Sequence, residues 1–246
     1  MTNWNMILLI LLLVYQTVAS IMDLRDMRKY KKIKITEKVK LSFYKETIVW
    51  GWVPALIVFA FVFFLKLSLD DIGIRKMMFG DIIWLNVITL IISLIILCIL
   101  LYQVYLYFTN TAYRKQMQEE LDIRKKSSNY YNRVTASLVV PYTVREKRYF
   151  FFVSLTAGIC EELVWRGCIL FLLAELFPAL HFVVIGGIAC LLFGLFHCYQ
   201  GWYGILKTSI IAVLFVLIYQ TTGSLLLGML LHFLFDFVSA FLVGKE

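Results

Sequence analysis

Charged residues are scarce in this chain. They account for 16% of its 246 residues, against about 25% in typical soluble domains, whereas hydrophobic residues account for 61%. This balance excludes an ordinary soluble domain and indicates an integral membrane protein in contact with the lipid bilayer. The sequence also lacks internal repeats, low-complexity tracts and a boundary between domains, so we expect residues 1–246 to form a single membrane domain.

Paired cysteines and the common metal-binding motifs are missing as well. The five cysteines lie within or beside apolar runs, without the spacing of a disulfide or zinc framework. The zinc-protease motif HExxH and the ExxH repeat of di-iron bundles do not occur. Motif spacing therefore predicts no cofactor.

Long apolar runs are abundant, and they predict an all-α, polytopic bundle of seven transmembrane helices. The runs cover residues 4–22, 47–67, 82–108, 149–176, 181–197, 203–219 and 224–243. An eighth helix is the alternative, because the fourth run could break after Gly167 into a spanning helix and a short re-entrant piece. We interpret the first run as a membrane anchor rather than a signal peptide, because basic residues follow it and none precedes it.

Basic residues are concentrated in two of the connections between these runs. Residues 23–46 and residues 110–148 each contain nine Lys or Arg, whereas residues 66–81 contain three. The positive-inside rule then places both rich segments in the cytoplasm and the amino terminus outside. Basic clusters beside membrane helices normally meet anionic lipid, so we expect no nucleic-acid partner. The sequence sets no oligomeric state.

The fourth apolar run contains Glu161, Glu162 and Arg166. Each ionisable side chain at bilayer depth costs about 2.5 to 3.5 kcal/mol, and such residues usually mark a functional site. Helical spacing places Glu162 and Arg166 on one face and Glu161 about 100 degrees away. We therefore expect Arg166 to neutralise and position Glu162, and Glu161 to act as a general base without a local counter-charge. A purely structural ion pair is the alternative for Glu162 and Arg166.

Two of the three histidines also lie on apolar helices. His197 follows Phe193 by four residues, beside small residues that would let another helix approach closely. His232 and Asp236 belong to a polar stripe on the last run. Each could be a packing or hydrogen-bonding residue on its own, but polar groups on three separate apolar helices favour one shared site. The third histidine, His181, is expected at the membrane interface.

Three motifs occur in order along the second half of the chain. They are EELVWR at residues 161–166, FGLFH at residues 193–197 and HFLFD at residues 232–236. Together they resemble the EExxxR, FxxxH and HxxxN or HxxxD motifs of the CPBP family, which contains CAAX prenyl proteases and bacteriocin-processing enzymes and is also called Abi. The resemblance covers residues 149–243, as a catalytic helix core, and leaves residues 1–148 as amino-terminal helices and cytoplasmic loops.

The resemblance implies a glutamate-dependent intramembrane endopeptidase in a bacterial plasma membrane. Its substrate would be a peptide or membrane-tethered protein, and its role bacteriocin or pheromone maturation or self-immunity. A non-catalytic membrane immunity or scaffold protein is the alternative. A small transporter is a fainter option, because the repeats of many such folds are missing.

The resemblance also implies a role for each motif residue. Glu161 becomes the general base and His197 its partner in holding a water, while His232 and Asp236 lie where the family stabilises the oxyanion. The orienting residues are Glu162, Arg166 and Phe193. An ionised Asp236 would repel an oxyanion, so the preferred alternative is that it fixes the tautomer of His232. Zinc bound by Glu161, His197 and His232 is the alternative to a metal-free site.

The predicted helix ends conflict with a shared site. Counting 1.5 Å per residue, Glu161 would lie about 18 Å deep, whereas His197 would lie close to the cytoplasmic surface. Either the fourth helix begins outside the hydrocarbon, or the fifth is tilted and displaced. We expect a water-filled cavity that opens toward the cytoplasm, with Trp165 and Phe193 among its walls.

Overall fold

The computed structural model describes residues 2–80, 82–127 and 129–242, and within these ranges the chain forms helices and no strand. The predicted all-α class is therefore confirmed. The α-helices are α1 (Thr2–Tyr30), α2 (Glu37–Phe64), α3 (Ile83–Thr109), α4 (Thr111–Lys126), α5 (Tyr130–Leu138), α6 (Val144–Glu162), α7 (Leu170–Leu176), α8 (Phe182–Phe196), α9 (Gly201–Thr222) and α10 (Leu226–Phe241). The short elements are the 3₁₀ turns η1 (Leu69–Ile72) and η3 (Cys198–Gln200) and the π-helix η2 (Leu163–Ile169).

Four helices in the described part of the chain are long and apolar enough to cross a membrane. They are Asn3–Tyr30, Glu37–Phe64, Ile83–Thr109 and Cys198–Thr222, while α8 and α10 are apolar but shorter. Large apolar side chains are exposed along these helices, such as Phe63 at 87% and Ile83 at 75%. Such a surface would be unstable in water but is suited to lipid, as expected of a multi-pass membrane protein.

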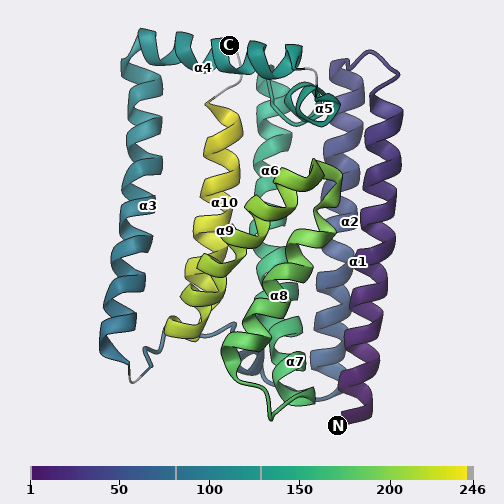
Figure 1. Ribbon diagram of the computed structural model, residues 1–246, viewed down its shortest axis with the longest axis vertical. Coiled ribbons are helices and arrows are strands. Elements are labelled where there is room, and N and C mark those ends of the chain that lie inside the picture. The colour runs from purple at the N-terminus through teal and green to yellow at the C-terminus, as the bar shows by residue number, and fades with distance from the viewer. Residues whose placement is uncertain (1, 81, 128, 243–246) are drawn as a thin grey trace.

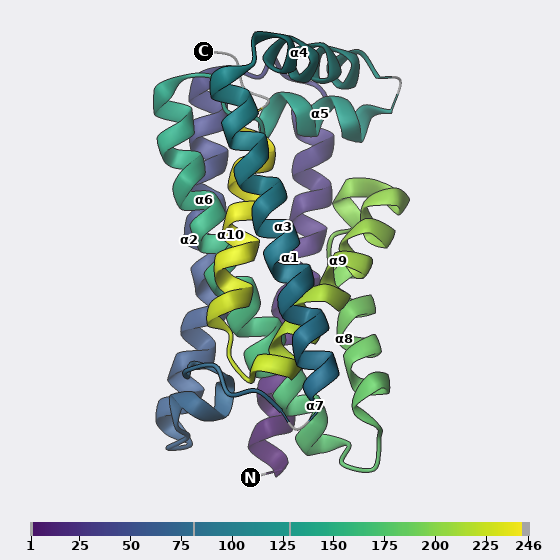
Figure 2. The same cartoon turned by 90° about the vertical axis from the view of Figure 1, so that its left-hand side faces the viewer.

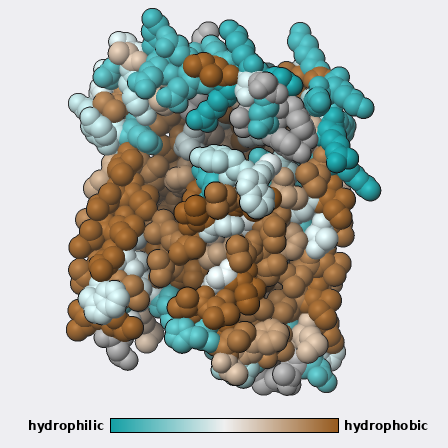
Figure 3. Space-filling model, in the orientation of Figure 1, coloured by the Kyte–Doolittle hydropathy of each residue, from teal (hydrophilic) through white to brown (hydrophobic). Residues whose placement is uncertain are grey.

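The two basic segments lie at the same end of the bundle (Figure 1). Helices α4 and α5 lie across this end, and the α1–α2 connection reaches it, whereas the α2–α3 connection lies at the opposite end. Hydrophilic side chains cover this basic end, and below it the visible face is mainly hydrophobic (Figure 3). This arrangement agrees with the prediction that both basic segments lie on the same side of the membrane.

Several helices extend beyond the apolar runs that predicted them. Helix α1 continues to Tyr30 and α2 begins at Glu37, so most of the predicted loop at residues 23–46 is helical. Outside hydrocarbon a helix no longer needs apolar side chains, so hydropathy alone underestimates its length. The predicted seventh run ended at residue 243, which lies outside the described residues.

The fourth predicted helix is continuous from residue 144 to residue 176, because α6 leads into the π-helix η2 and then into α7. The break after Gly167, which would have produced an eighth crossing, is therefore wrong. Helix α6 begins before the predicted residue 149, at a capping box in which the Thr143 hydroxyl accepts from the Glu146 N–H and the Glu146 carboxylate accepts from the Thr143 N–H. This start supports the first explanation of the depth conflict.

The second explanation is supported by the hairpin formed by α8, η3 and α9. Helix α8 has 15 residues and α1 has 29, so at 1.5 Å per residue they are about 22 Å and 43 Å long. As a result the α8–α9 turn lies below the level of the basic end, and α9 runs obliquely back toward the opposite end (Figures 1 and 2). His197, at the end of α8, is thereby held within the height of the bundle, near the middle of the long fourth helix.

Glycines let the helices that form the site approach closely. A Cβ atom on Gly194 of α8 would lie 2.6 Å from the Ile205 carbonyl oxygen of α9, and one on Gly158 of α6 would lie 2.8 Å from the Phe233 nitrogen of α10. Neither position has room for a larger side chain. The close approach predicted from the small residues of the fifth run is confirmed.

Candidate active site

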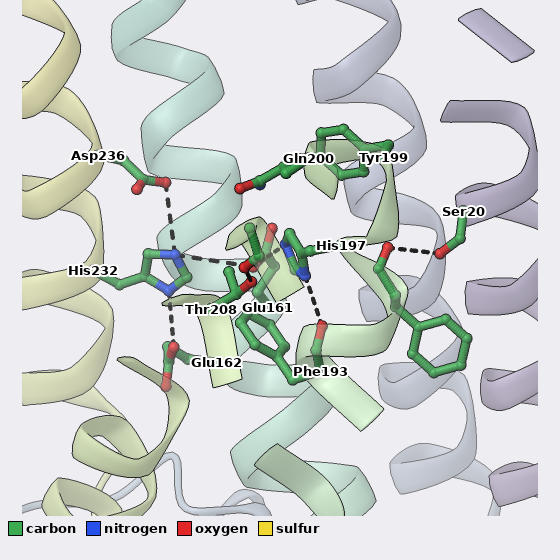
Figure 4. Close-up of polar contacts among 12 residues, drawn as sticks. Ser20, Glu161, Glu162, Phe193, His197, Tyr199, Gln200, Thr208, His232 and Asp236 are labelled. Carbon is green, nitrogen blue, oxygen red and sulfur yellow. Dashed lines mark hydrogen bonds and ion pairs between the residues drawn. The ribbon is translucent and has the colours of Figure 1, made fainter. Parts of the chain in front are cut away.

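Three polar clusters converge at the centre of the bundle, from the end of α6, the end of α8 and the middle of α10 (Figure 4). The Glu161 Oε2 atom lies 4.0 Å from Nε2 of His197 and 3.9 Å from Nε2 of His232. Asp236 Oδ2 lies 3.6 Å from the same His232 nitrogen. The structure thus brings together the four residues that the sequence assigned to catalysis.

A buried charged triad lies beneath these groups. Arg166 Nη1 is 3.0 Å from Glu162 Oε1, and Nδ1 of His232 lies 2.8 Å from the same oxygen. The Arg166 and Glu162 side chains are only 2% and 1% exposed. Buried charges are stable only when they are paired, so each member of the triad depends on the others. The predicted pairing of Arg166 with Glu162 is confirmed, and the triad extends it to a second helix, α10.

Aromatic rings enclose the Arg166 guanidinium. Its carbon lies 4.6 Å from the centroid of the Phe193 ring and 5.2 Å from that of the Phe215 ring. Phe215 also stacks on the His232 ring, with centroids 5.0 Å apart and planes inclined by 26°. A desolvated guanidinium over aromatic faces gains cation–π stabilisation, which partly offsets its burial. Phe193 and Phe215 therefore fix Arg166 from two sides.

Glu161 differs from Glu162 in its access to solvent. Its side chain is 34% exposed, whereas that of Glu162 is 1% exposed. Its carboxylate faces both imidazoles at distances that exceed a direct hydrogen bond. One carboxylate of the adjacent pair is thus held in the protein interior, and the other is accessible and faces the two histidines.

His197 is oriented by its own helix. Its Nδ1 lies 2.7 Å from the carbonyl oxygen of Phe193, which can only accept, so this nitrogen carries the proton. The Nε2 atom consequently faces Glu161 as the nitrogen available for chemistry. Phe193 therefore orients the site in two ways, by its carbonyl toward His197 and by its ring toward Arg166.

The tautomer of His232 is set by Glu162 rather than by Asp236. Glu162 accepts from Nδ1, while Asp236 lies 3.6 Å from Nε2, beyond a hydrogen bond. The structure thus contradicts the hypothesis that Asp236 fixes this tautomer. Spacing on one helix suggested Asp236, four residues from His232, whereas the hydrogen bond forms across helices that are far apart in sequence.

A comparison with known families agrees with this geometry. Residues 145–238 match the family described as type II CAAX prenyl endopeptidase Rce1-like. We call this part of the chain the Rce1-like domain, because it is similar to that family. The family is one of peptide-bond hydrolases within the membrane, which confirms the resemblance that the three motifs indicated. No curated protein and no solved structure matches this chain.

Helix α1, outside the matched residues, also contributes to the site of the Rce1-like domain. The hydroxyl of Ser20 donates to the carbonyl of Phe196 at 2.7 Å, and Ser20 is 7% exposed. This bond ties the last turn of α8, next to His197, to the amino-terminal helix (Figure 4). Neither Ser20 nor Phe215 was predicted, because a single serine or phenylalanine on an apolar helix carries no signal in the sequence.

The predicted cavity walls need correction. Trp165 and Phe193 are each 4% exposed, and their rings pack edge to face with centroids 5.4 Å apart. The two side chains support the Rce1-like site from beneath instead of lining an open space. Trp165 is buried because it belongs to the π-helix η2, whose residues 163–169 are all buried, and Phe193 packs against it from α8. Such segments are frequent at functional sites and are not visible in hydropathy.

Proposed function

We propose that this protein is an intramembrane endopeptidase in which Glu161 activates a water to hydrolyse a peptide bond. The main supporting observation is the partly exposed Glu161 carboxylate, which faces the Nε2 atoms of two histidines on different helices. Peptide hydrolysis requires a base near the attacking water and donors near the developing negative oxygen. The groups around Glu161 supply both.

The oriented side chains suggest how the work is divided. Glu161 takes a proton from the water, while Nε2 of His197 accepts a hydrogen bond from it and holds it for attack on the carbonyl carbon. His232 in its charged form has two N–H donors. One donates to Glu162 and the other would donate to the oxyanion. Glu162 and Asp236, on either side of the ring, stabilise that positive charge. The proton held by Glu161 then passes to the leaving amine.

Asp236→Asn is expected to retain appreciable cleavage, within about tenfold of the native rate. An asparagine can itself donate to the oxyanion, and the hydrogen bond from His232 to Glu162 is unchanged. The rate is measured on membranes that contain equal amounts of each protein. Complete loss of cleavage in a normally folded variant would show that the negative charge of Asp236 itself is required.

Zinc held by Glu161, His197 and His232 stays the alternative to a metal-free site. Within the described residues, no group of three or more His, Cys, Asp or Glu side chains is placed as a metal-binding cluster. The three residues of the zinc alternative do lie close together, because Glu161 Oε2 is 4.0 Å from Nε2 of His197 and 3.9 Å from Nε2 of His232. Metal analysis of the purified protein, with cleavage measured before and after a strong chelator, decides between the two.

We further propose seven membrane-embedded helical segments, with the basic end in the cytoplasm of a bacterium. They comprise α1, α2, α3, the rod from α6 to α7, α8, α9 and α10, with α8 and α9 forming a hairpin that stops short of the basic end. The nine basic residues in each of the segments 23–46 and 110–148 support this orientation. A cysteine introduced at Lys125 should react only with reagents supplied from the cytoplasmic side, and labelling from outside would reverse the assignment.

The substrate we propose is a peptide or a membrane-tethered protein. Protein processing such as bacteriocin or pheromone maturation, or self-immunity, would use a site of this kind. Mass spectrometry of peptides released by membranes that carry the native chain, compared with membranes that carry a Glu161 variant, would identify the cleaved bond.

A further inference from the structure

A groove outside the catalytic centre runs along the outer faces of α6 and α10, which lie side by side in both ribbon views (Figures 1 and 2). Its volume is about 1,100 Å³. We call it the α6–α10 groove, and it is lined chiefly by Lys147, Arg148, Phe151, Phe152, Phe237 and Phe241. No catalytic residue lines it, so the Rce1-like chemistry does not account for it.

The upper rim of the α6–α10 groove carries two basic side chains that have no ion-pair partner in the described part of the chain. Lys147 and Arg148 form no ion pair with any residue in the described part of the chain, and Arg148 is exposed. The one carboxylate nearby in sequence, Glu146, is 3.1 Å from the buried Lys40 and is also engaged in the capping box of α6. Two cations at the mouth of the groove are therefore available to an anion.

The floor of the groove is aromatic. The Phe151 and Phe237 rings meet edge to face with centroids 5.6 Å apart, and the Phe237 and Phe241 centroids are 5.2 Å apart. Phe152 is 54% exposed and Phe151 is 38% exposed. The Lys147 ammonium lies 4.7 Å from the centroid of the Phe241 ring, where the charged rim meets this floor. From residue 143 to residue 152 the groove follows α6 for about 14 Å.

The basic rim and the aromatic floor follow one another along the groove as the headgroup and the acyl chains do in a lipid. The rim lies at the start of α6, at the basic end of the bundle. Phe241, the last residue of α10, lies at the level of the rim, and Phe151, Phe152 and Phe237 lie deeper along the two helices. In a membrane, this places the cations at the level of the headgroups and the rings at the level of the acyl chains. A soluble anion has no apolar part to contact the phenylalanines of the floor, and a neutral lipid would leave the cations unpaired.

We propose that the α6–α10 groove binds one anionic phospholipid, with its phosphate against Lys147 and Arg148 and an acyl chain along the four phenylalanines. This proposal is independent of the proposed catalytic function. It assigns a binding site to the outer face of the same two helices that carry Glu161 and His232 on their inner faces.

Native mass spectrometry of the purified full chain, with phosphatidylglycerol or phosphatidylcholine added, tests the proposal. The double variant K147Q/R148Q should bind phosphatidylglycerol about thirtyfold more weakly than the native chain, as expected for two basic side chains at a lipid headgroup. The matched control R25Q/R28Q removes two exposed charges from the same end of the bundle and should lose less than about threefold. E161Q should bind as the native chain does, even if catalysis fails.

Four results would overturn the proposal. One is equal binding of phosphatidylcholine and phosphatidylglycerol, and another is an equal loss in K147Q/R148Q and R25Q/R28Q. The third is displacement of phosphatidylglycerol by a peptide that carries an apolar chain, which would assign the groove to substrate. Glycerol phosphate, which has no acyl chains, serves as the probe for the rim alone. If it bound as tightly as phosphatidylglycerol, the aromatic floor would have no part in binding, and the proposal would also fail.

Discussion

Replacing Glu161 by glutamine is expected to lower the rate of peptide-bond hydrolysis by about 10² to 10⁴-fold, the usual contribution of a general base. Glutamine has nearly the same shape but cannot take a proton from water. Since the Glu161 side chain is 34% exposed and belongs to no buried ion pair, the variant should fold and accumulate in membranes normally. Mass spectrometry of peptides released by membranes with equal amounts of each protein measures the effect.

Glu175→Gln is the matched control for this experiment. Glu175 is exposed and lies on α7, in the same continuous helical rod as Glu161, so the substitution is chemically identical but far from the histidines. It should leave cleavage unchanged. If Glu161→Gln and the native chain released the same peptides at the same rate, the protein would be a scaffold or immunity protein that keeps its polar cluster for folding.

Replacing Arg166 by methionine is expected to lower the free energy of unfolding by about 3 to 5 kcal/mol, the cost of leaving a buried charge without its partner. The guanidinium is 2% exposed, pairs with Glu162 and lies between two phenylalanine rings. Methionine fills much of the volume but leaves Glu162 with only His232 as partner. Thermal unfolding of the purified protein in detergent measures the loss.

Two further variants separate lost charge from lost packing at Arg166. Arg25→Met changes an exposed arginine on α1 and should leave the unfolding temperature unchanged. The double variant E162Q/R166M should recover part of the stability, because it removes the carboxylate that lost its guanidinium partner while keeping the same cavity. If Arg166→Met were as stable as Arg25→Met, the triad would not contribute to folding.

The two adjacent glutamates show which contacts helical spacing can predict and which it cannot. Residues four apart on one helix meet whatever surrounds them, so the contact between Glu162 and Arg166 was predictable. The same geometry turned Glu161 toward another surface. Which residues Glu161 meets there depends on how α8 and α10 pack. The sequence showed only that His197 and His232 lie on apolar helices.

Local spacing misled where a competing partner came from another helix. Asp236 is four residues from His232 and was expected to fix its tautomer. Instead, Nδ1 of His232 donates to Glu162, on the neighbouring helix α6, at 2.8 Å. Buried groups pair with the nearest strong acceptor, and in a helical bundle this acceptor is often distant in sequence. The contacts of Ser20 with Phe196 and of Phe215 with His232 were unpredictable for the same reason.

Composition and apolar periodicity by themselves determined that this protein is an all-helical membrane protein, and the three motifs indicated residues that lie together at the candidate site. These properties follow from the cost of placing charge and unpaired backbone groups in hydrocarbon, which acts on each segment separately. Only the tertiary structure decided the depth of His197, the continuity of the fourth helix through a π-helical segment and the partners of Glu162. Those features depend on helix length, close packing at Gly158 and Gly194, and side chains brought together from distant helices, which no single segment contains.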